Sequence, residues 1–178
     1  MSESDWLMRE AAAGDAAAFG VLVRQHQSKL RGFLLRMTRG NHALADDLAQ
    51  ETFLEAFRKI AQYGTGSFFG WLCAIAYSRY LMEARKRKLE SLDEAAELAD
   101  DAPEAESASI VRIDLEKAFA RLVPAQRAAL TMCFALGMSN EEAAAALEMP
   151  LGTLKSHVNR GREKLAALLE VPRIKAVS

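Results

Sequence analysis

The stretch SNEEAAAALEMPLGTLKSHVNRGR, residues 139–162, predicts two helices joined by a short turn. Ser139 and Glu142 have the spacing of a capping box, in which the hydroxyl accepts a backbone N–H and the carboxylate reaches back to the N-cap. The first helix is short and rich in alanine, so another helix can pack very close to it. A short helix, a tight turn and a longer helix form the helix-turn-helix pattern.

The second of these helices is predicted over about residues 152–169 and has two different faces. One is a narrow apolar seam with spacings of four and three residues, made by Leu154, Val158, Gly161, Leu165 and Leu168. The other is polar and basic and holds Thr153, Lys155, Ser156, His157, Asn159, Arg160 and Arg162. In a helix-turn-helix this face lies in the major groove, where it reads base edges and neutralises phosphates. A helical hairpin with a solvated basic face would give the same pattern, and that alternative stays open.

Two more helices are predicted upstream of this pair. One spans residues 110–122, and the next is opened by Pro124 and ended by Gly137. Together with the helix-turn-helix they predict a C-terminal domain over residues 110–171, followed by a short tail at 172–178.

Three helices are predicted in the N-terminal half, over residues 15–39, 41–63 and 68–89, with a Gly-rich loop before the third. Asp15 is a suitable N-cap for the first of them. Apolar residues recur at three- and four-residue steps, and no segment alternates apolar with polar residues. The fold class is therefore all-α, with a first small domain of three or four helices over residues 1–89.

Residues 90–109 predict an acidic linker between the two domains. This segment holds eight acidic residues and no Lys or Arg. The remainder of the chain has 23 basic and 16 acidic residues, a charge of +7, although the whole chain has a net charge of −1. Two basic domains joined by an acidic linker indicate a polyanionic partner.

Composition excludes several classes of protein. No run approaches the roughly 18 apolar residues of a membrane span, and the acidic N-terminus does not resemble a secretory signal. Cys73 and Cys133 stand 60 residues apart, and the chain has only three His. We therefore expect no disulfide framework, no metal site and no cofactor, in a soluble protein of a reducing, cytoplasmic compartment. Nothing resembles a pair of catalytic groups, so the sequence does not support an enzyme.

The second predicted helix has an unusual outer face. Its core stripe centres between Leu48 and Thr52. The far side groups acidic, amide and apolar residues, with Glu51 at its edge: Asp46, Asp47, Gln50, Leu54 and Phe57. Exposed apolar residues beside acids are typical of a protein-docking surface. The alternative is that Phe57 packs under a neighbouring helix.

The third predicted helix combines aromatic residues with a basic run. The run is Arg85, Lys86, Arg87 and Lys88, and the rings before it are Tyr63, Phe68, Phe69, Trp71, Tyr77 and Tyr80. Rings on which bases stack, beside cations that follow phosphates, suit a single-stranded nucleic acid. Simple capping of the helix C-terminus by cations is the alternative. We expect Trp71 to lie in the core and Tyr77 to be exposed.

Four motifs, in this order, resemble those of the extracytoplasmic-function (ECF, group IV) sigma factors of the sigma-70 family. They are DDLAQETF at residues 46–53, FGWLCAIA at 69–76, LVPAQR at 122–127 and GTLKSHVNRGR at 152–162. The likeness covers roughly residues 16–88 and 112–169.

This resemblance implies a function for each domain. The first domain would bind the clamp coiled coil of the largest catalytic RNA polymerase subunit through Asp46, Asp47, Gln50 and Glu51, with Leu54 and Phe57 beside them. It would also recognise and melt the −10 promoter element and capture a flipped base. The residues matched to that role are Thr65, Ser67, Trp71, Tyr77, Ser78, Arg79 and the basic run at 85–88.

The second domain would read the duplex −35 element, through Thr153, Lys155, Ser156, His157, Asn159, Arg160 and Arg162. The acidic linker would run near the RNA exit path. The family also implies core RNA polymerase and an anti-sigma factor as partners, and no reaction by the chain itself.

The chain departs from the family pattern at four places. Tyr77 and Ser78 replace the usual Arg-Asn, residues 142–144 read Glu-Ala-Ala where Glu-Ile-Ala is usual, Val123 replaces Pro and His157 replaces Arg. The Tyr77-Ser78 departure lies in the surface predicted to melt the promoter. It therefore affects which −10 sequence the protein would prefer.

Two rival interpretations remain. A sigma-like decoy would bind an anti-sigma factor instead of DNA. Such proteins usually carry a receiver domain, and a decoy would not need the basic faces that this chain has. An ordinary helix-turn-helix regulator would bind duplex DNA without polymerase, but it would not need the acidic and apolar face around residues 46–57.

Overall fold

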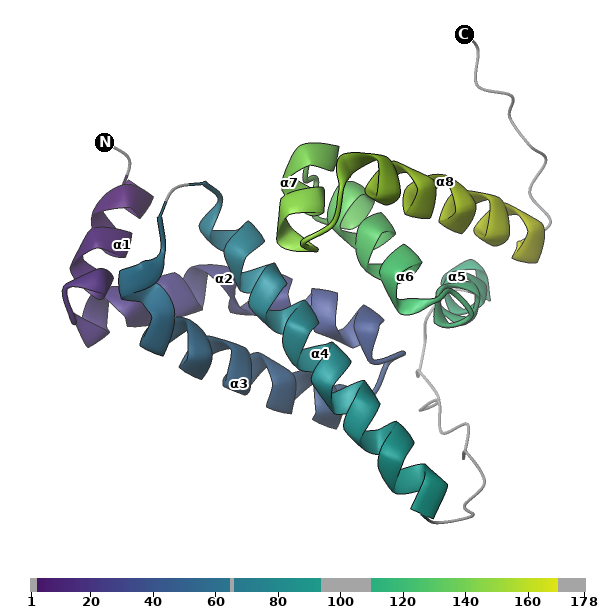
Figure 1. Ribbon diagram of the computed structural model, residues 1–178, viewed down its shortest axis with the longest axis horizontal. Coiled ribbons are helices and arrows are strands. Elements are labelled where there is room, and N and C mark those ends of the chain that lie inside the picture. The colour runs from purple at the N-terminus through teal and green to yellow at the C-terminus, as the bar shows by residue number, and fades with distance from the viewer. Residues whose placement is uncertain (1–2, 65, 94–109, 170–178) are drawn as a thin grey trace, which may run out of the picture. The chain divides into compact units, whose positions relative to one another are not determined.

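The computed structural model describes residues 3–64, 66–93 and 110–169, and all regular elements among them are helical (Figure 1). The chain divides into two compact units, Met1–Asp101 and Ala102–Ser178. The all-α prediction is confirmed. Most of the predicted linker, residues 94–109, and the end of the chain from residue 170 lie outside the described residues. No helix in the described part of the chain is long and apolar enough to cross a membrane.

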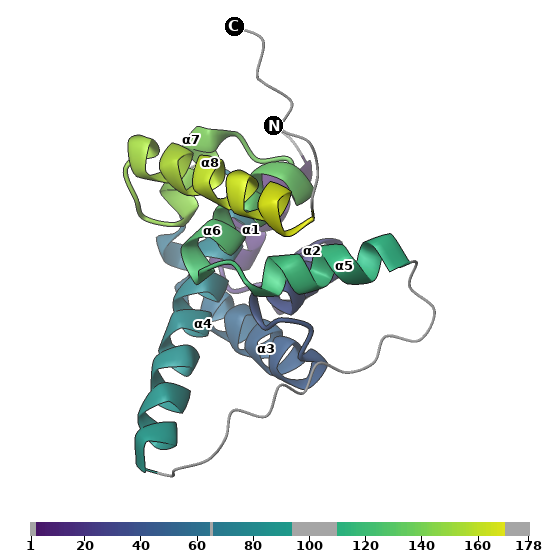
Figure 2. The same ribbon diagram turned by 90° about the vertical axis from the view of Figure 1, so that its right-hand side faces the viewer.

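The described residues of the first unit form four α-helices and one short turn of 3-10 helix. They are α1 Glu3–Ala12, α2 Ala16–Met37, α3 His42–Lys59, η1 Ile60–Gln62 and α4 Phe68–Asp93. Helices α2, α3 and α4 pack against one another, and α1 packs on α2 and η1. The C-terminal half of α4 extends beyond α2 and α3, as both views show (Figures 1 and 2).

Local capping explains where α2 begins and where α3 follows it. The Asp15 carboxylate accepts hydrogen bonds from the N–H groups of Ala17 and Ala18, at 2.8 and 3.2 Å. The α2–α3 turn passes through Gly40 at φ +85°, and Asn41 Oδ1 then accepts from the Leu44 N–H at 3.0 Å. The predicted Asp15 cap is thus confirmed, and both caps satisfy backbone groups that a helix end leaves unpaired.

The core of the first unit is built from one face of each helix. Its fully buried members include Leu22, Leu30, Phe33, Leu34, Met37, Ala45, Leu48, Thr52, Ala56, Leu72, Cys73 and Ala76. The one hydroxyl in this set is satisfied locally, since Thr52 Oγ1 donates to the Leu48 carbonyl at 2.7 Å. Met82, by contrast, is 59% exposed. It belongs to the C-terminal half of α4, which extends beyond α2 and α3.

The second unit contains α5 Ile110–Ala120, α6 Pro124–Leu130, the π-helical turn η2 Thr131–Ala135, α7 Asn140–Ala146 and α8 Leu151–Leu168. Pro124 opens α6 as predicted, and Gly137, at φ +69°, follows the segment's end. The π-helical turn was not predicted.

Helices α6 and α8 approach very closely at Gly161. A Cβ atom placed on this glycine would lie 2.7 Å from Cδ1 of Leu130 and 3.4 Å from Cβ of Gln126. The absence of a side chain at position 161 therefore permits the contact that fixes α8 against α6.

Candidate nucleic-acid interface and docking surface

Helices α7 and α8 form the predicted helix-turn-helix. Ser139 Oγ accepts the Glu142 N–H at 3.1 Å, and Glu142 Oε2 accepts the Ser139 N–H at 2.8 Å, which completes the capping box. The chain then turns through Glu148, whose φ is +50°, and α8 begins after Pro150. These bonds matter because α7 has only seven residues and little stability of its own.

The two faces of α8 are separated as predicted. Leu154, Val158 and Gly161 are buried in the seam, while Leu165 and Leu168 are only half-buried. The polar side chains Thr153, Lys155, Asn159, Arg160 and Arg162 are exposed, and Ser156 and His157 are half-buried. The exposed set presents cations and hydrogen-bonding groups on one face of a rigid helix, as duplex recognition requires.

Two contacts near this helix were missed by sequence reasoning. Phe134, on η2, is 64% exposed, and the guanidinium carbon of Arg162 lies 5.9 Å from its ring centre. Arg127, on α6, is fully buried and donates from Nη2 to the Leu122 carbonyl at 2.8 Å. Its position three residues before the buried Leu130 was the available signal, because that spacing places both on one helix face.

The predicted outer face of α3 is largely accessible. Asp47, Gln50 and Glu51 are exposed, and the Leu54 side chain is 58% exposed. Phe57 is 41% exposed, yet its ring centre lies 5.0 Å from that of Phe19 on α2. Both interpretations of Phe57 are therefore partly right, because one side of the ring packs and the other faces solvent. The stripe from Asp47 to Phe57 offers acids and apolar surface together.

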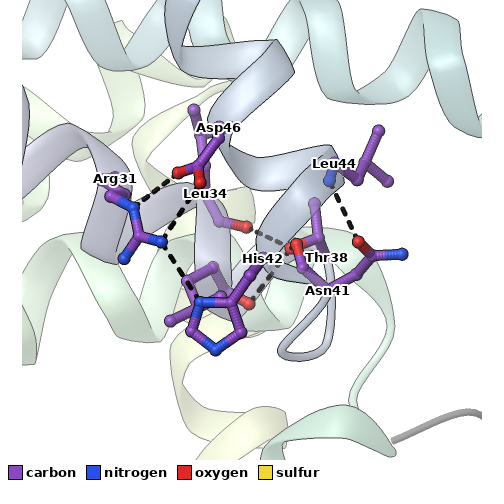
Figure 3. A network of polar contacts seen from close by, with 8 residues as sticks. Arg31, Leu34, Thr38, Asn41, His42, Leu44 and Asp46 are labelled. Atoms are coloured by element: carbon purple, nitrogen blue, oxygen red, sulfur yellow. Dashed lines mark hydrogen bonds and ion pairs between the residues drawn. The ribbon is translucent and has the colours of Figure 1, made fainter. Parts of the chain in front are cut away.

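Asp46 is tied to α2 by side-chain contacts within the unit (Figure 3). Arg31 on α2 donates from Nε to its Oδ1 at 2.5 Å and from Nη2 to Oδ2 at 3.3 Å. The same Nη2 donates to Nδ1 of His42 at 3.2 Å. The hydrogen bond from Arg31 lowers the pKa of Asp46 below its usual value. Asp46 thus ties the start of α3 to α2.

The loop before α4 is held by local bonds and by aromatic packing. The Tyr63 hydroxyl donates to the Gly66 carbonyl at 2.5 Å, and Ser67 Oγ accepts the Gly70 N–H at 3.1 Å. Trp71 is half-buried, with its ring centre 5.3 Å from Tyr63 and 5.8 Å from Phe68. Thr65, matched to the −10 role, lies outside the described residues.

His26 on α2 lies beneath this aromatic group. Its ring stacks on Phe69 at 5.6 Å between centres and lies 5.3 Å from Phe68. Its buried Nδ1 atom has no hydrogen-bond partner. Burial, followed by the charge of Lys29, lowers the pKa of His26. No sequence pattern singles out His26, because its aromatic neighbours come from a helix about 40 residues away.

The surface of α4 after the aromatic group is basic. Ser78, Arg85, Lys86, Arg87 and Lys88 are exposed, while Tyr77 and Arg79 are half-buried. Arg87 pairs with Glu83 at 2.8 Å and Lys86 with Glu90 at 3.9 Å. The helix continues to Asp93, past the predicted end at residue 89, so the basic run does not cap a helix terminus. That weakens the alternative in which these cations serve only the helix dipole.

Arg79 points to a different partner. Its Nε donates to Oε2 of Glu55, and its Nη1 donates to Oε2 of Glu51 at 3.4 Å. Both acids lie on α3. Glu51 had been predicted as a docking residue and Arg79 as a nucleic-acid residue, and the structure brings the two together.

The two cysteines are not arranged for chemistry. Cys73 is buried in the core of the first unit, and burial raises the pKa of its thiol to about 12. Cys133 is partly buried, with Sγ 3.5 Å from Asn140 Oδ1. Within residues 3–64, 66–93 and 110–169, no three His, Cys, Asp or Glu side chains gather in a group that would hold a metal ion.

Fold and surfaces together define a class of protein: the described residues form two all-helical units, one with a helix-turn-helix and the other with an exposed acidic and apolar face beside a basic, aromatic helix. Comparison with known families agrees with this class. The family model described as Sigma-70 region 2 matches residues 22–90, and that described as Sigma-70, region 4 matches residues 112–165.

Individual proteins give the same result. The ECF RNA polymerase sigma factor SigE of Mycolicibacterium smegmatis is 38% identical over 165 residues, which are 86% of this chain and 63% of that protein. The ECF RNA polymerase sigma factor EcfG of Rhodopseudomonas palustris is 37% identical over 145 residues, 80% of each. The chain therefore spans less than two thirds of SigE and most of EcfG.

Solved structures are similar as well. The sigma factor RpoE of Bartonella quintana, in complex with the anti-sigma factor NepR, matches with a TM-score of 0.77 and 32% identity, over 87% of this chain and 98% of that one. CnrH, in complex with the cytosolic domain of CnrY, matches with a TM-score of 0.70 and 26% identity, over 94% and 97%. The chain belongs to the ECF sigma factors of the sigma-70 family.

Proposed function

We propose that this protein is a promoter-specificity subunit of RNA polymerase, which binds the core enzyme and directs promoter recognition, promoter melting and transcription initiation. The observation that carries the proposal is the pairing of two surfaces in one family member: an exposed acidic and apolar face on α3 and an exposed basic face on α8. Each surface suits one partner, polymerase for the first and DNA for the second.

The polymerase surface consists of Asp47, Gln50, Glu51, Leu54 and Phe57, with Asp46 at its edge. Exposed carboxylates attract a basic partner and fix its register. Leu54 and Phe57 supply apolar area that the complex would bury.

The −10 surface consists of the loop before α4 and the outer face of that helix. Its residues are Thr65, Ser67, Trp71, Tyr77, Ser78, Arg85, Lys86, Arg87 and Lys88, with Arg79 beside Ser78. The rings would stack on unpaired bases, and the exposed cations would follow the phosphates.

The −35 surface is the polar face of α8, made by Thr153, Lys155, Ser156, His157, Asn159, Arg160 and Arg162. If Arg160 reads a guanine, Arg160→Ala should weaken binding by about 1–3 kcal/mol for promoters that carry this guanine and have little effect on promoters that lack it. If it holds only a phosphate, the loss is similar for all sequences.

The protein would carry out no reaction of its own and would act in the cytoplasm, where polymerase does the chemistry. Its domains would be residues 1–89 and 110–171, joined by the acidic linker at 90–109. An anti-sigma factor is proposed as its control partner, since the similar B. quintana protein was solved in complex with one.

The test is run-off transcription by purified core RNA polymerase on a library of promoter fragments, with and without this protein. Transcripts that depend on it, with shared −35 and −10 sequences, are expected. Asp47→Arg should abolish them by reversing a charge on the α3 face. Glu10→Arg is the control, because it also replaces an acid by arginine but does so on α1, outside all three surfaces.

The alternatives give different results. A decoy would bind neither polymerase nor promoter DNA. A plain helix-turn-helix regulator would bind duplex DNA tightly without polymerase and would be indifferent to Asp47→Arg.

A further inference from the structure

Arg79 differs from the basic residues that follow it on α4. Arg87 and Lys86 pair with Glu83 and Glu90 of their own helix. The guanidinium of Arg79 instead reaches α3, where it bonds Glu55 through Nε and Glu51 through Nη1. It is therefore a cross-link between two helices.

The charges around this cross-link balance. Glu55 also accepts a hydrogen bond from Nζ of Lys59 at 2.5 Å. Two carboxylates thus face two cations. The bonds from Lys59 and then from Arg79 lower the pKa of Glu55, which keeps it ionised at neutral pH. A guanidinium already compensated by two carboxylates attracts a phosphate less than an exposed cation does.

The cross-link lies where the two proposed surfaces meet. Glu51 belongs to the polymerase surface on α3. Arg79 directly follows Ser78 of the −10 surface on α4. Helices α3 and α4 also pack together, and the Arg79 guanidinium adds directional, charge-assisted hydrogen bonds to two side chains of α3.

We propose that Arg79 is a positioning residue and not a phosphate contact: it holds the −10 surface of α4 in place relative to the polymerase surface of α3. The inference rests on the proposed function. Loss of the cross-link should impair promoter opening by the polymerase complex, since unpaired bases would meet displaced rings. Polymerase affinity and the salt dependence of DNA binding should change little.

The experiment compares Arg79→Lys, Arg79→Gln and the double variant Arg79→Gln/Glu55→Gln, each bound to core polymerase. Lysine keeps the charge but cannot make the forked contact. Promoter opening is followed by the permanganate reactivity of unpaired thymines. Both single variants should reduce opening by about threefold to tenfold, and the double variant should be no worse than Arg79→Gln. Circular dichroism checks that each variant is folded.

Salt dependence supplies the readout that separates positioning from phosphate contact. Each lost phosphate contact lowers the slope of log K against log salt by about 0.7–0.9. Arg85→Gln, on the exposed run of the same helix, should show this decrease, and Arg79→Gln should not.

Two results would count against the inference: wild-type opening by Arg79→Lys, or a slope decrease in Arg79→Gln equal to that of Arg85→Gln. Either would leave the proposed function intact, because the wild-type protein would still form the promoter complex. If the wild-type protein itself forms no polymerase-dependent complex, the proposed function fails and the inference fails with it.

Discussion

At the scale of single residues, Asp46 and Asp47 show how neighbours in sequence take different roles. Asp46 is held by Arg31, which also contacts His42, whereas Asp47 is exposed. An acid already paired within its own unit gains less from a basic partner than an exposed one does.

We therefore predict that Asp47→Asn weakens binding to core polymerase by about threefold or more, while Asp46→Asn has a smaller effect on binding. The two substitutions change charge and shape equally, so each is the other's control. Binding is measured by the fluorescence anisotropy of labelled protein titrated with core enzyme. Equal losses for the two variants would mean that the Arg31 pair opens on binding.

His26 predicts a pH dependence of stability. Burial against Phe68 and Phe69 lowers its pKa in the folded state from 6.5, so the unfolded chain binds the proton more readily. The free energy of unfolding should then fall as pH drops below about 7 and through 6.5. Above about pH 7 the contribution of His26 to the free energy of unfolding is fully present, because His26 is neutral in both the folded and the unfolded state.

Urea unfolding at pH 7.5 and pH 5.5 measures this effect. His26→Leu keeps an apolar side chain against the rings but cannot titrate, so it should lose less stability between the two pH values than the wild-type protein. The same loss in both proteins would assign the pH dependence to other groups.

Phe134 predicts a contribution to DNA binding through Arg162. The exposed ring lies 5.9 Å from the guanidinium and restricts it before DNA arrives. Phe134→Ala should weaken promoter binding by the polymerase complex by about 0.5–1 kcal/mol. In the Arg162→Gln background, the same substitution should have no such effect. Val123→Ala, at another exposed apolar residue of the second unit, is the control. Equal effects of Phe134→Ala in both backgrounds would show that the ring acts without Arg162.

At the scale of elements, sequence patterns predicted what is local. Three features show this: the Ser139 capping box, the Asp15 cap and the apolar seam of α8. In each of them, successive residues of the pattern are at most four positions apart. Helix α1 was not predicted, because among its residues 6–12, whose burial is described, Leu7 and Ala11 alone are buried and give a weak periodic signal. The π-helical turn and the Arg79 bridge were not predicted either. The bridge depends on how α3 and α4 pack together, which a single helical wheel cannot represent.

Gly161 permits the close packing of α8 on α6. Gly161→Ala would place a methyl group 2.7 Å from the buried Leu130 side chain, which cannot move without disturbing the core. We expect it to destabilise the second unit by about 1–3 kcal/mol. Gly152→Ala, also in α8 but with nothing within 4 Å, should instead be neutral or stabilise by up to about 1 kcal/mol. Thermal unfolding of the full chain measures both, and similar results for the two glycines would contradict this packing.

At the scale of the whole molecule, one chain holds two compact units, and a DNA-reading surface is proposed for each. Each unit has its own core: Arg127 and Leu154 are buried in the second, Phe33 and Leu72 in the first. The sequence predicts an acidic tether between them. A tether alone gives a low effective concentration of one reading surface near the other's site, whereas a polymerase that binds both units would set their separation.

The spacing of the two promoter elements should therefore matter only to the polymerase complex. We predict that the free protein binds a promoter duplex weakly at physiological salt, and that two base pairs added between the −35 and −10 elements change this binding little. The same insertion should reduce binding by the polymerase complex by about tenfold or more, because the complex can no longer engage both elements. Anisotropy titrations on the two duplexes, with and without core enzyme, measure all four affinities. Tight, spacing-dependent binding by the free protein would show instead that the chain itself holds its two reading surfaces at a set distance.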